Sequence, residues 1–164
     1  MCIRDSAEPA IQHVVEHFAG VPARQEFIGT VDGARVYNDT TATTPEATLA
    51  ALDVIPGPWI LIVGGSDKRI DFATLANRLC NDEDVRAIIL LPGTGTDRLL
   101  PLLPAGRIER AAGMGPAVTR ALKMAHPGDA VVLSPACASF GLFNNEFDRG
   151  DQFEARVREF GLDR

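Results

Sequence analysis

Residues 59–91 read WILIVGGSDKRIDFATLANRLCNDEDVRAIILL. The stretch contains two apolar runs, 59–63 and 85–91, and between them a segment, 71–79, that reads as a helix. Unbroken apolar runs are typical of strands that are buried on both faces, and a helix between two such strands indicates a parallel pair joined by a crossover. The stretch therefore predicts an α/β fold in which helices cover a sheet.

The same alternation continues on both sides of this stretch. Toward the C-terminus we expect a helix that follows Gly93 and Gly95 and runs through Leu103, a strand at 107–111, a helix at 115–125, a strand at 130–134 and a helix at 146–160. Toward the N-terminus we expect a helix at 9–18, strands at 26–30 and 34–37 joined by an Asp-Gly turn, and a helix that begins at Pro45 and has Leu49, Leu52 and Val54 on its apolar face. The prediction is a mostly parallel sheet flanked by helices, with an N-terminal antiparallel hairpin.

The bulk composition limits the classes of function. With 164 residues, of which 46% are hydrophobic, the chain is expected to form one main globular unit. A formal charge of −6 and a pI near 5.0 argue against a nucleic-acid partner. No apolar run approaches the roughly 20 residues that span a bilayer, so we expect no membrane partner. Three cysteines without a CxxC pair indicate neither a disulfide framework nor a metal site, and they suit the cytoplasm.

Three polar segments follow predicted strands, which is where parallel sheets gather their ligands. They are YNDTTATTPEAT (37–48), GGSDKRIDF (64–72) and SPACASFGLFNNEFDRG (134–150). The first is either an elaborate helix cap or an anion site at a helix N-terminus. The second is not a phosphate-binding P-loop, and its Lys68 is either a solvated surface charge or an anion ligand. In the third, we expect Cys137 to be a packed core residue rather than a nucleophile, because no histidine lies in its segment.

Together with GVPARQE (20–26), these segments resemble, in order and spacing, the motifs of the C-terminal domain of the glutamate-adding Mur ligases. The resemblance implies a Rossmann-like fold. It implies that glutamate is bound by Thr43, Lys68, Ser139, Phe140 and Phe147. It places Arg24, Asn38 and Asp39 at the nucleotide, although Arg24 read alone could equally be a surface charge. It assigns no catalytic residue and no metal ligand to this chain.

In that family, ATP phosphorylates the carboxylate of UDP-N-acetylmuramoyl-L-alanine, and the amine of D-glutamate attacks the acyl phosphate during peptidoglycan synthesis. Magnesium offsets the charge of the phosphates. The resemblance therefore implies the glutamate-binding domain of an ATP-dependent, ADP-forming ligase. ATP and Mg²⁺ would be bound mainly by domains outside this chain, which alone should be inactive. We expect a cytoplasmic monomer.

Departures from the family pattern leave alternatives open. Thr41 stands where the commonest form of the motif has a lysine that helps to hold glutamate, so an L-glutamate-adding ligase of the same family remains an alternative. Ala23 replaces the usual histidine of the linker, and Phe147 lies one residue later than the usual aromatic. A non-enzymatic, Rossmann-like module that binds a dicarboxylate or nucleotide is the third reading.

The N-terminal residues differ in character from the rest of the chain. Residues 1–6, MCIRDS, lack the apolar core of a signal peptide and any continuity with the segment after them. We expect them to be a non-native leader on a chain that has been cut upstream. We assign 7–24 to the end of a central domain and its linker, and 25–164 to the glutamate-binding domain.

Overall fold

The computed structural model describes residues 8–18 and 20–163. The helices are α1 (Glu8–His17), α2 (Pro45–Val54), α3 (Ala73–Asn81), α4 (Thr94–Leu99), α5 (Met114–Met124) and α6 (Glu146–Arg158), with two short 3₁₀ helices, η2 (Leu100–Leu102) and η3 (Ala105–Arg107). The strands are β1 (Glu26–Val31), β2 (Ala34–Asn38), β3 (Trp59–Val63), β4 (Val85–Leu90), β5 (Ile108–Arg110) and β6 (Ala130–Leu133). The leader expected at 1–6 lies outside the described residues.

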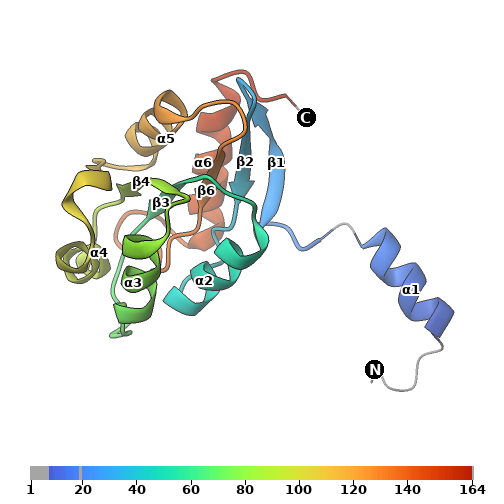
Figure 1. Cartoon of the computed structure of the whole chain (residues 1–164), viewed down its shortest axis with the longest axis horizontal. Helices are drawn as coiled ribbons and strands as arrows, with labels where there is room; N and C mark the ends of the chain where they lie inside the picture. Colours follow the sequence, from blue (N-terminus) through green and yellow to red (C-terminus); the bar gives the residue numbers. More distant parts are fainter. Residues whose placement is uncertain (1–7, 19, 164) are drawn as a thin grey trace.

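The strands form one sheet in the order β1-β2-β6-β3-β4-β5 (Figure 1). Only the β1–β2 hairpin is antiparallel, and the other four pairings are parallel. The register aligns Val36, Val131, Ile60 and Ala87 in one row across four strands. The prediction of a mostly parallel sheet with an N-terminal hairpin is confirmed.

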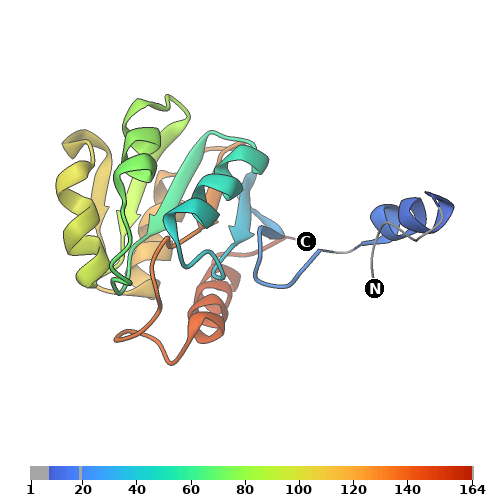
Figure 2. The same ribbon diagram turned by 90° about the horizontal axis from the view of Figure 1, so that it is seen from below.

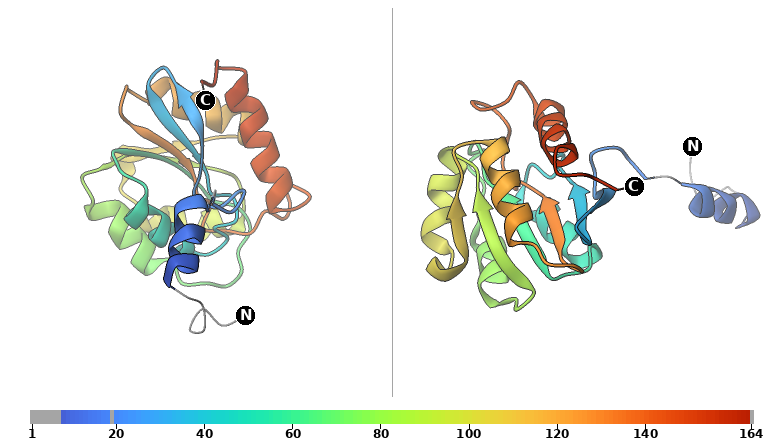
Figure 3. Two further views of the ribbon diagram at one scale, coloured as in Figure 1. Left: turned by 90° about the vertical axis from the view of Figure 1, so that its right-hand side faces the viewer. Right: turned by 90° about the horizontal axis from the view of Figure 1, so that it is seen from above.

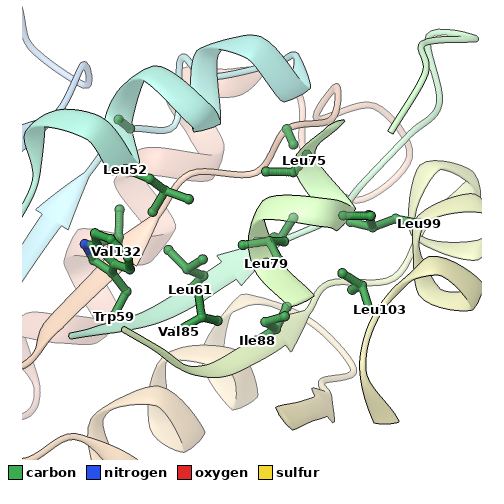
Figure 4. Packing of buried hydrophobic residues seen from close by; sticks show 14 of the residues in the cluster. Leu52, Trp59, Leu61, Leu75, Leu79, Val85, Ile88, Leu99, Leu103 and Val132 are labelled. Atoms are coloured by element: carbon green, nitrogen blue, oxygen red, sulfur yellow. The ribbon is translucent and has the colours of Figure 1, made fainter. Parts of the chain in front are cut away.

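One face of the sheet is covered by α2, α3 and the α4–η2 segment. Leu52, Leu75 and Leu99 project from these helices onto Leu61 and its neighbours in the sheet, and all are at most 2% exposed (Figure 4). Alternate residues of each central strand point to this face, because successive side chains of a strand point to opposite sides. Each fully buried Leu contributes about 1.5–3 kcal/mol relative to an exposed one.

The other face is covered by α5 and α6, which lie side by side (Figure 3). Val118 of α5 and Phe153 of α6 are fully buried against Ile60, Ile62 and Val131. The C-terminal residues then return to the edge strand, where Thr30 and Asp163 exchange backbone hydrogen bonds of 2.7 and 2.8 Å. With both faces covered, the loops at the ends of the strands are left to carry function.

Two details of the predicted elements are corrected. The helix expected to run through Leu103 ends at Leu99 and continues as a 3₁₀ turn, because Pro101 lacks the N–H that an α-helix would donate to the carbonyl of Asp97. Val54, expected on the apolar face of α2, is 66% exposed, because it is the last residue of the helix and lies beyond the sheet contact made by Leu52.

Helix α1 lies apart from the sheet and its covering helices (Figures 1 and 2). None of its residues is buried, and its apolar side chains Val14 and Val15 are 62% and 72% exposed. The helix predicted at 9–18 is therefore present but makes no contribution to the core. Among residues 8–18 and 20–163, we find no helix with the length and apolar character that a bilayer crossing needs.

Candidate functional site at the carboxyl ends of the parallel strands

The loops that follow β2, β3, β4 and β6 meet at one edge of the sheet. The amide of Asp39 donates to the carbonyl of Leu133 at 2.9 Å, which joins the β2 and β6 loops. Ser66 and Ala138 exchange two backbone hydrogen bonds of 2.9 and 3.1 Å, which join the β3 and β6 loops. These are the loops that carry the three polar segments, so the structure brings together what the sequence holds up to a hundred residues apart.

Glycine makes the close approach of these loops sterically allowed. A Cβ atom at Gly65 would lie 2.4 Å from the carbonyl oxygen of Ala138, and one at Gly93 would lie 2.2 Å from the carbonyl oxygen of Gly65. Both glycines have positive φ angles, +141° and +150°, which side chains disfavour. The loops therefore pack backbone against backbone at these two positions.

Lys68 and Thr43 lie together in this site. The Lys68 Nζ atom donates to Thr43 Oγ1 at 3.0 Å, although 25 residues separate them. Thr43 immediately precedes Thr44, which is the N-cap of α2 and whose hydroxyl lies 3.4 Å from the amide of Ala47. An exposed ammonium, a hydroxyl and a helix N-terminus thus form one group of hydrogen-bond donors, which is the chemistry that binds a carboxylate.

The Lys68 loop is held in place by its neighbour Asp67. The carboxylate of Asp67 accepts two hydrogen bonds from Nη1 of Arg98, at 2.8 and 2.9 Å, and its backbone amide donates to Thr94 Oγ1 at 3.0 Å. The hydrogen bond from Arg98 is the main cause that lowers the pKa of Asp67. Asp67 is therefore ionised at neutral pH and ties the β3 loop to α4.

The predicted residues of the β6 loop and of the first turn of α6 differ in exposure. Ser139 is 3% exposed and directly follows Ala138, which pairs with the Lys68 loop. Phe140 and Phe147 are 66% and 57% exposed, and the carbonyl of Phe140 accepts a hydrogen bond from the hydroxyl of Ser66. The structure thus places Ser139 within the joined loops and leaves the rings of Phe140, in the same loop, and Phe147, in α6, largely exposed to solvent.

Asn38 and Asp39 are buried, each 2% exposed, and their side chains bond within the domain. Asn38 Nδ2 donates to Glu154 Oε1 at 2.9 Å. The Asp39 carboxylate accepts hydrogen bonds from the Gln25 amide at 3.0 Å and from the Ser134 hydroxyl at 2.8 Å. Burial raises the pKa of Asp39, while these two hydrogen bonds and the nearby charge of Arg24 act in the opposite direction.

Cys137 is 2% exposed and belongs to the hydrophobic core, as predicted. Burial raises the pKa of its thiol to about 12, so the thiolate is scarce at neutral pH. The side chain is therefore a packing group rather than a nucleophile. Within the described part of the chain, no three or more His, Cys, Asp or Glu side chains gather where they could hold a metal ion.

Sequence reasoning missed Arg149, which is fully buried. Its guanidinium donates to Thr40 Oγ1 at 3.0 Å, to the Thr40 carbonyl at 2.7 Å and to the Cys137 carbonyl at 3.0 Å. An arginine in the charged first turns of a helix reads as a surface residue. The signal was the next residue, Gly150, because a glycine inside a helix is unfavourable unless close packing requires it. A Cβ there would lie 2.8 Å from Thr40 Cγ2.

Known proteins resemble this chain in sequence over most of its length. The family model described as "Mur ligase, glutamate ligase domain" matches residues 23–137. The UDP-N-acetylmuramoylalanine--D-glutamate ligase of Roseiflexus sp. (strain RS-1) is 41% identical, with 97% of this chain and 35% of the relative covered. The enzyme of the same name from Symbiobacterium thermophilum is 42% identical, with 90% and 33% covered. This chain thus spans about a third of the length of these relatives.

Among solved structures, the MurF ligase from Thermotoga maritima in complex with ADP matches with a TM-score of 0.59 and 13% identity. The match covers 92% of this chain and 36% of that one. At this level of identity the similarity shows the fold alone. The shared fold is the α/β fold described above, with its mostly parallel six-stranded sheet.

Proposed function

We propose that this chain, which belongs to the Mur ligase family, is the glutamate-binding part of an enzyme that adds D-glutamate to UDP-N-acetylmuramoyl-L-alanine. The observation that carries the proposal is the contact between Lys68 Nζ and Thr43 Oγ1 at 3.0 Å. It joins two of the segments that resemble the family's motifs, at the edge of the sheet where ligands of α/β proteins bind. The names of the relatives supply the enantiomer and the acceptor substrate.

Glutamate carries two carboxylates and one amine, and the site would hold it by the carboxylates. Lys68 supplies a charge on a flexible stem, which suits a group that must be bound and later released. Thr43 and Ser139 add hydroxyl donors, and the exposed rings of Phe140 and Phe147 would flank the aliphatic part of the substrate. The contribution to catalysis is proximity and orientation of the amine rather than acid–base chemistry.

In the complete enzyme, ATP would phosphorylate the carboxylate of UDP-N-acetylmuramoyl-L-alanine and leave as ADP. The glutamate nitrogen would then attack the acyl carbon, form the amide bond and release phosphate. ATP, Mg²⁺ and the acceptor substrate would be held mainly by the two thirds of the relatives that this chain does not cover. We therefore expect this chain alone to be inactive, and we place the enzyme, as a monomer, in the cytoplasm.

Three residues of this chain are proposed to serve the nucleotide. Arg24 is exposed and close enough to Asp39 to affect its pKa, so it is the group best placed to reach a phosphate or ribose. Asn38 and Asp39 would act mainly by fixing the loop beneath it, because their side chains bond to Glu154, Gln25 and Ser134.

L-glutamate is the second candidate substrate, because of Thr41. The Thr41 hydroxyl donates to the carbonyl of Ala23 at 2.8 Å, and it provides no cation where the commonest family motif has a lysine. Of the two lysines that the family motifs carry at the glutamate site, this chain has the one at position 68. The position and the number of positive charges can affect which enantiomer presents its amine correctly.

The proposal is tested by a chimera that joins this chain to the first two domains of a known D-glutamate-adding ligase. D-glutamate and L-glutamate are supplied separately, and amide product is measured. We expect product from D-glutamate, and we expect Lys68→Ala to raise the KM for glutamate about 10- to 100-fold by removing a charged hydrogen bond. Lys123→Ala is the matched control, because Lys123 is an exposed lysine of α5, on the other face of the sheet.

Each other outcome has a definite meaning. Product from L-glutamate alone would assign the chain to the alternative branch. No product with either enantiomer, from a chimera that is folded and binds ATP, would contradict the ligase proposal and favour a non-enzymatic binding module. Equal losses in the Lys68 and Lys123 variants would contradict the role of Lys68.

A further inference from the structure

The N-terminal part of α6 packs unusually closely on the loop that follows β2. Gly150 allows this approach, because a Cβ there would lie 2.8 Å from Thr40 Cγ2 and 3.1 Å from Asn38 Nδ2. The preceding residue, Arg149, extends beneath the site and is fully buried. It therefore sits between the loop after β2 and the loop after β6.

The hydrogen bonds of Arg149 go to both loops. Nη2 donates to the carbonyl of Thr40 at 2.7 Å and Nε donates to its hydroxyl at 3.0 Å, while Nη1 donates to the carbonyl of Cys137 at 3.0 Å. The Thr40 hydroxyl in turn donates to the carbonyl of Glu146 at 2.7 Å. The planar fork of a guanidinium fixes the relative positions of its acceptors, which a single ammonium cannot do.

Stability alone is a weak reason for this arrangement. Among the described residues, none of the ion pairs includes Arg149. Its hydrogen bonds go to carbonyl and hydroxyl oxygens, and the Glu146 carboxylate acts on its charge without direct contact. Burial lowers the pKa of Arg149 to about 10, which still leaves it charged at neutral pH. A buried charge of this kind is costly, and a hydrophobic residue of similar volume is often at least as stabilising.

We propose that Arg149 is a positioning residue that holds the Thr43 loop and the Ser139 loop in register for glutamate. Thr43 follows Thr40 by three residues, and Ser139 follows Cys137 by two, so the fork fixes the backbone just before each proposed ligand. Direct hydrogen bonds also join these loops: the amide of Ala136 donates to the carbonyl of Ala42 at 2.9 Å, and Asp39 is hydrogen-bonded to Leu133 and Ser134. That the ligand is glutamate rests on the proposed function, whereas the contacts of Arg149 with the two loops do not depend on it.

The test uses this chain with two readouts, native-state amide hydrogen exchange and the Kd for D-glutamate from an NMR titration. Arg149→Met removes the fork, and Arg149→Lys keeps a charge that can reach only one loop. Arg35→Met is the matched control. Arg35 also bridges carbonyls, those of Pro56 and Gly128 at 2.8 and 3.0 Å, but at the opposite end of the strands.

For both Arg149 variants we expect the amides of Asp39 and Ala136 to exchange about tenfold faster than in the wild type. This factor is what remains after correction for any change in exchange of the central strands, which reports the stability of the whole domain. We expect the Kd for D-glutamate to rise by about the same factor. Arg35→Met should lower the stability of the whole domain and leave the Kd unchanged. Should the methionine variant fail to fold, the lysine variant carries the test.

Two results would overturn the proposal. One is full restoration of loop protection and glutamate affinity by Arg149→Lys, which would show that charge suffices. The other is a uniform increase of exchange over the whole domain, as in Arg35→Met, which would leave Arg149 an ordinary part of the core. A wild-type chain that binds no D-glutamate would count against the proposed function, and the exchange data would still decide the role of Arg149.

Discussion

Asp39 places a carboxyl group where water barely reaches it. It is 2% exposed, and its two oxygens accept hydrogen bonds from Gln25 and Ser134. Desolvation is the largest influence and raises its pKa above the usual 3.8. A carboxyl whose pKa is higher in the folded protein stabilises the fold when protonated, and that contribution is lost as the pH rises through the folded-state pKa.

We therefore predict that Asp39→Asn is at least as stable as the wild type at neutral pH. The amide oxygen can accept from Gln25, and the amide nitrogen can donate to the Ser134 hydroxyl, which lies 3.0 Å from Thr48 Oγ1 as an alternative acceptor. Urea unfolding of both proteins between about pH 4 and pH 8 gives the difference in unfolding free energy. The wild type should lose stability relative to the variant as the pH rises.

Taking the difference cancels other carboxyls that titrate in the opposite sense. The pKa values of Asp67 and Asp148 are lowered, by a hydrogen bond from Arg98 and by the amide of Asn144 respectively, so their contributions are lost as the pH falls. If the wild type instead gained stability over the variant with rising pH, hydrogen bonds and Arg24 would outweigh burial at Asp39, contrary to our account.

At the scale of the elements, the site depends on how closely the loops after β3 and β6 approach each other. The β3 loop contacts the β6 loop at Gly65, where a Cβ would lie 2.4 Å from the carbonyl oxygen of Ala138 and where φ is +141°. A backbone atom cannot move aside as the end of a flexible side chain can. The turn after β3 therefore needs glycine for two independent reasons, space and backbone conformation.

We predict that Gly65→Ala lowers the free energy of unfolding by about 1–3 kcal/mol, the range of strained or overpacked sites. Gly115→Ala is the matched control. Gly115 lies in α5 with nothing within 4 Å of its Cβ position, so the same change should stabilise the protein by up to about 1 kcal/mol. Urea unfolding measures both. Equal effects of the two substitutions would contradict the packing described for the loops.

In the molecule as a whole, the linker before β1 is attached to the domain. The amide and hydroxyl of Thr41 both donate to the carbonyl of Ala23, at 3.2 and 2.8 Å, and the amide of Gln25 donates to Asp39. Helix α1, in contrast, has no buried residue. From these contacts we predict that the folded unit begins near Val21, inside the segment 7–24 that the sequence assigns to the end of a central domain and its linker.

Two truncations test this boundary. A chain that begins at Val21 should keep the stability of the parent within about 0.5 kcal/mol, because α1 buries nothing. A chain that begins at Glu26 should lose about 1–3 kcal/mol, because a buried carboxylate loses the Gln25 donor. Unfolding in urea again gives both values. A loss of that size on removal of α1 alone would show that the helix packs on the domain.

The elements of this protein follow from local sequence, because strands and helices depend on periodicity and on neighbouring residues. The runs at 59–63 and 85–91, the Asp-Gly hairpin and the helix start at Pro45 predict the sheet and its helices without long-range information. The motifs around Thr43, Lys68 and Ser139 could also be found, because each lies just after a strand. The family resemblance supplied their proposed roles, which local sequence does not contain.

How these segments meet could be learned only from the folded chain. The contact of Lys68 with Thr43, the desolvation of Asp39 and the burial of Arg149 all arise between residues at least 25 positions apart or between separate layers. Whether a charged side chain is buried depends on what the rest of the chain places around it, and no local pattern records that. Local sequence therefore specifies the elements and the candidate ligands, whereas the packing of distant loops sets which charges are buried and which meet in the site.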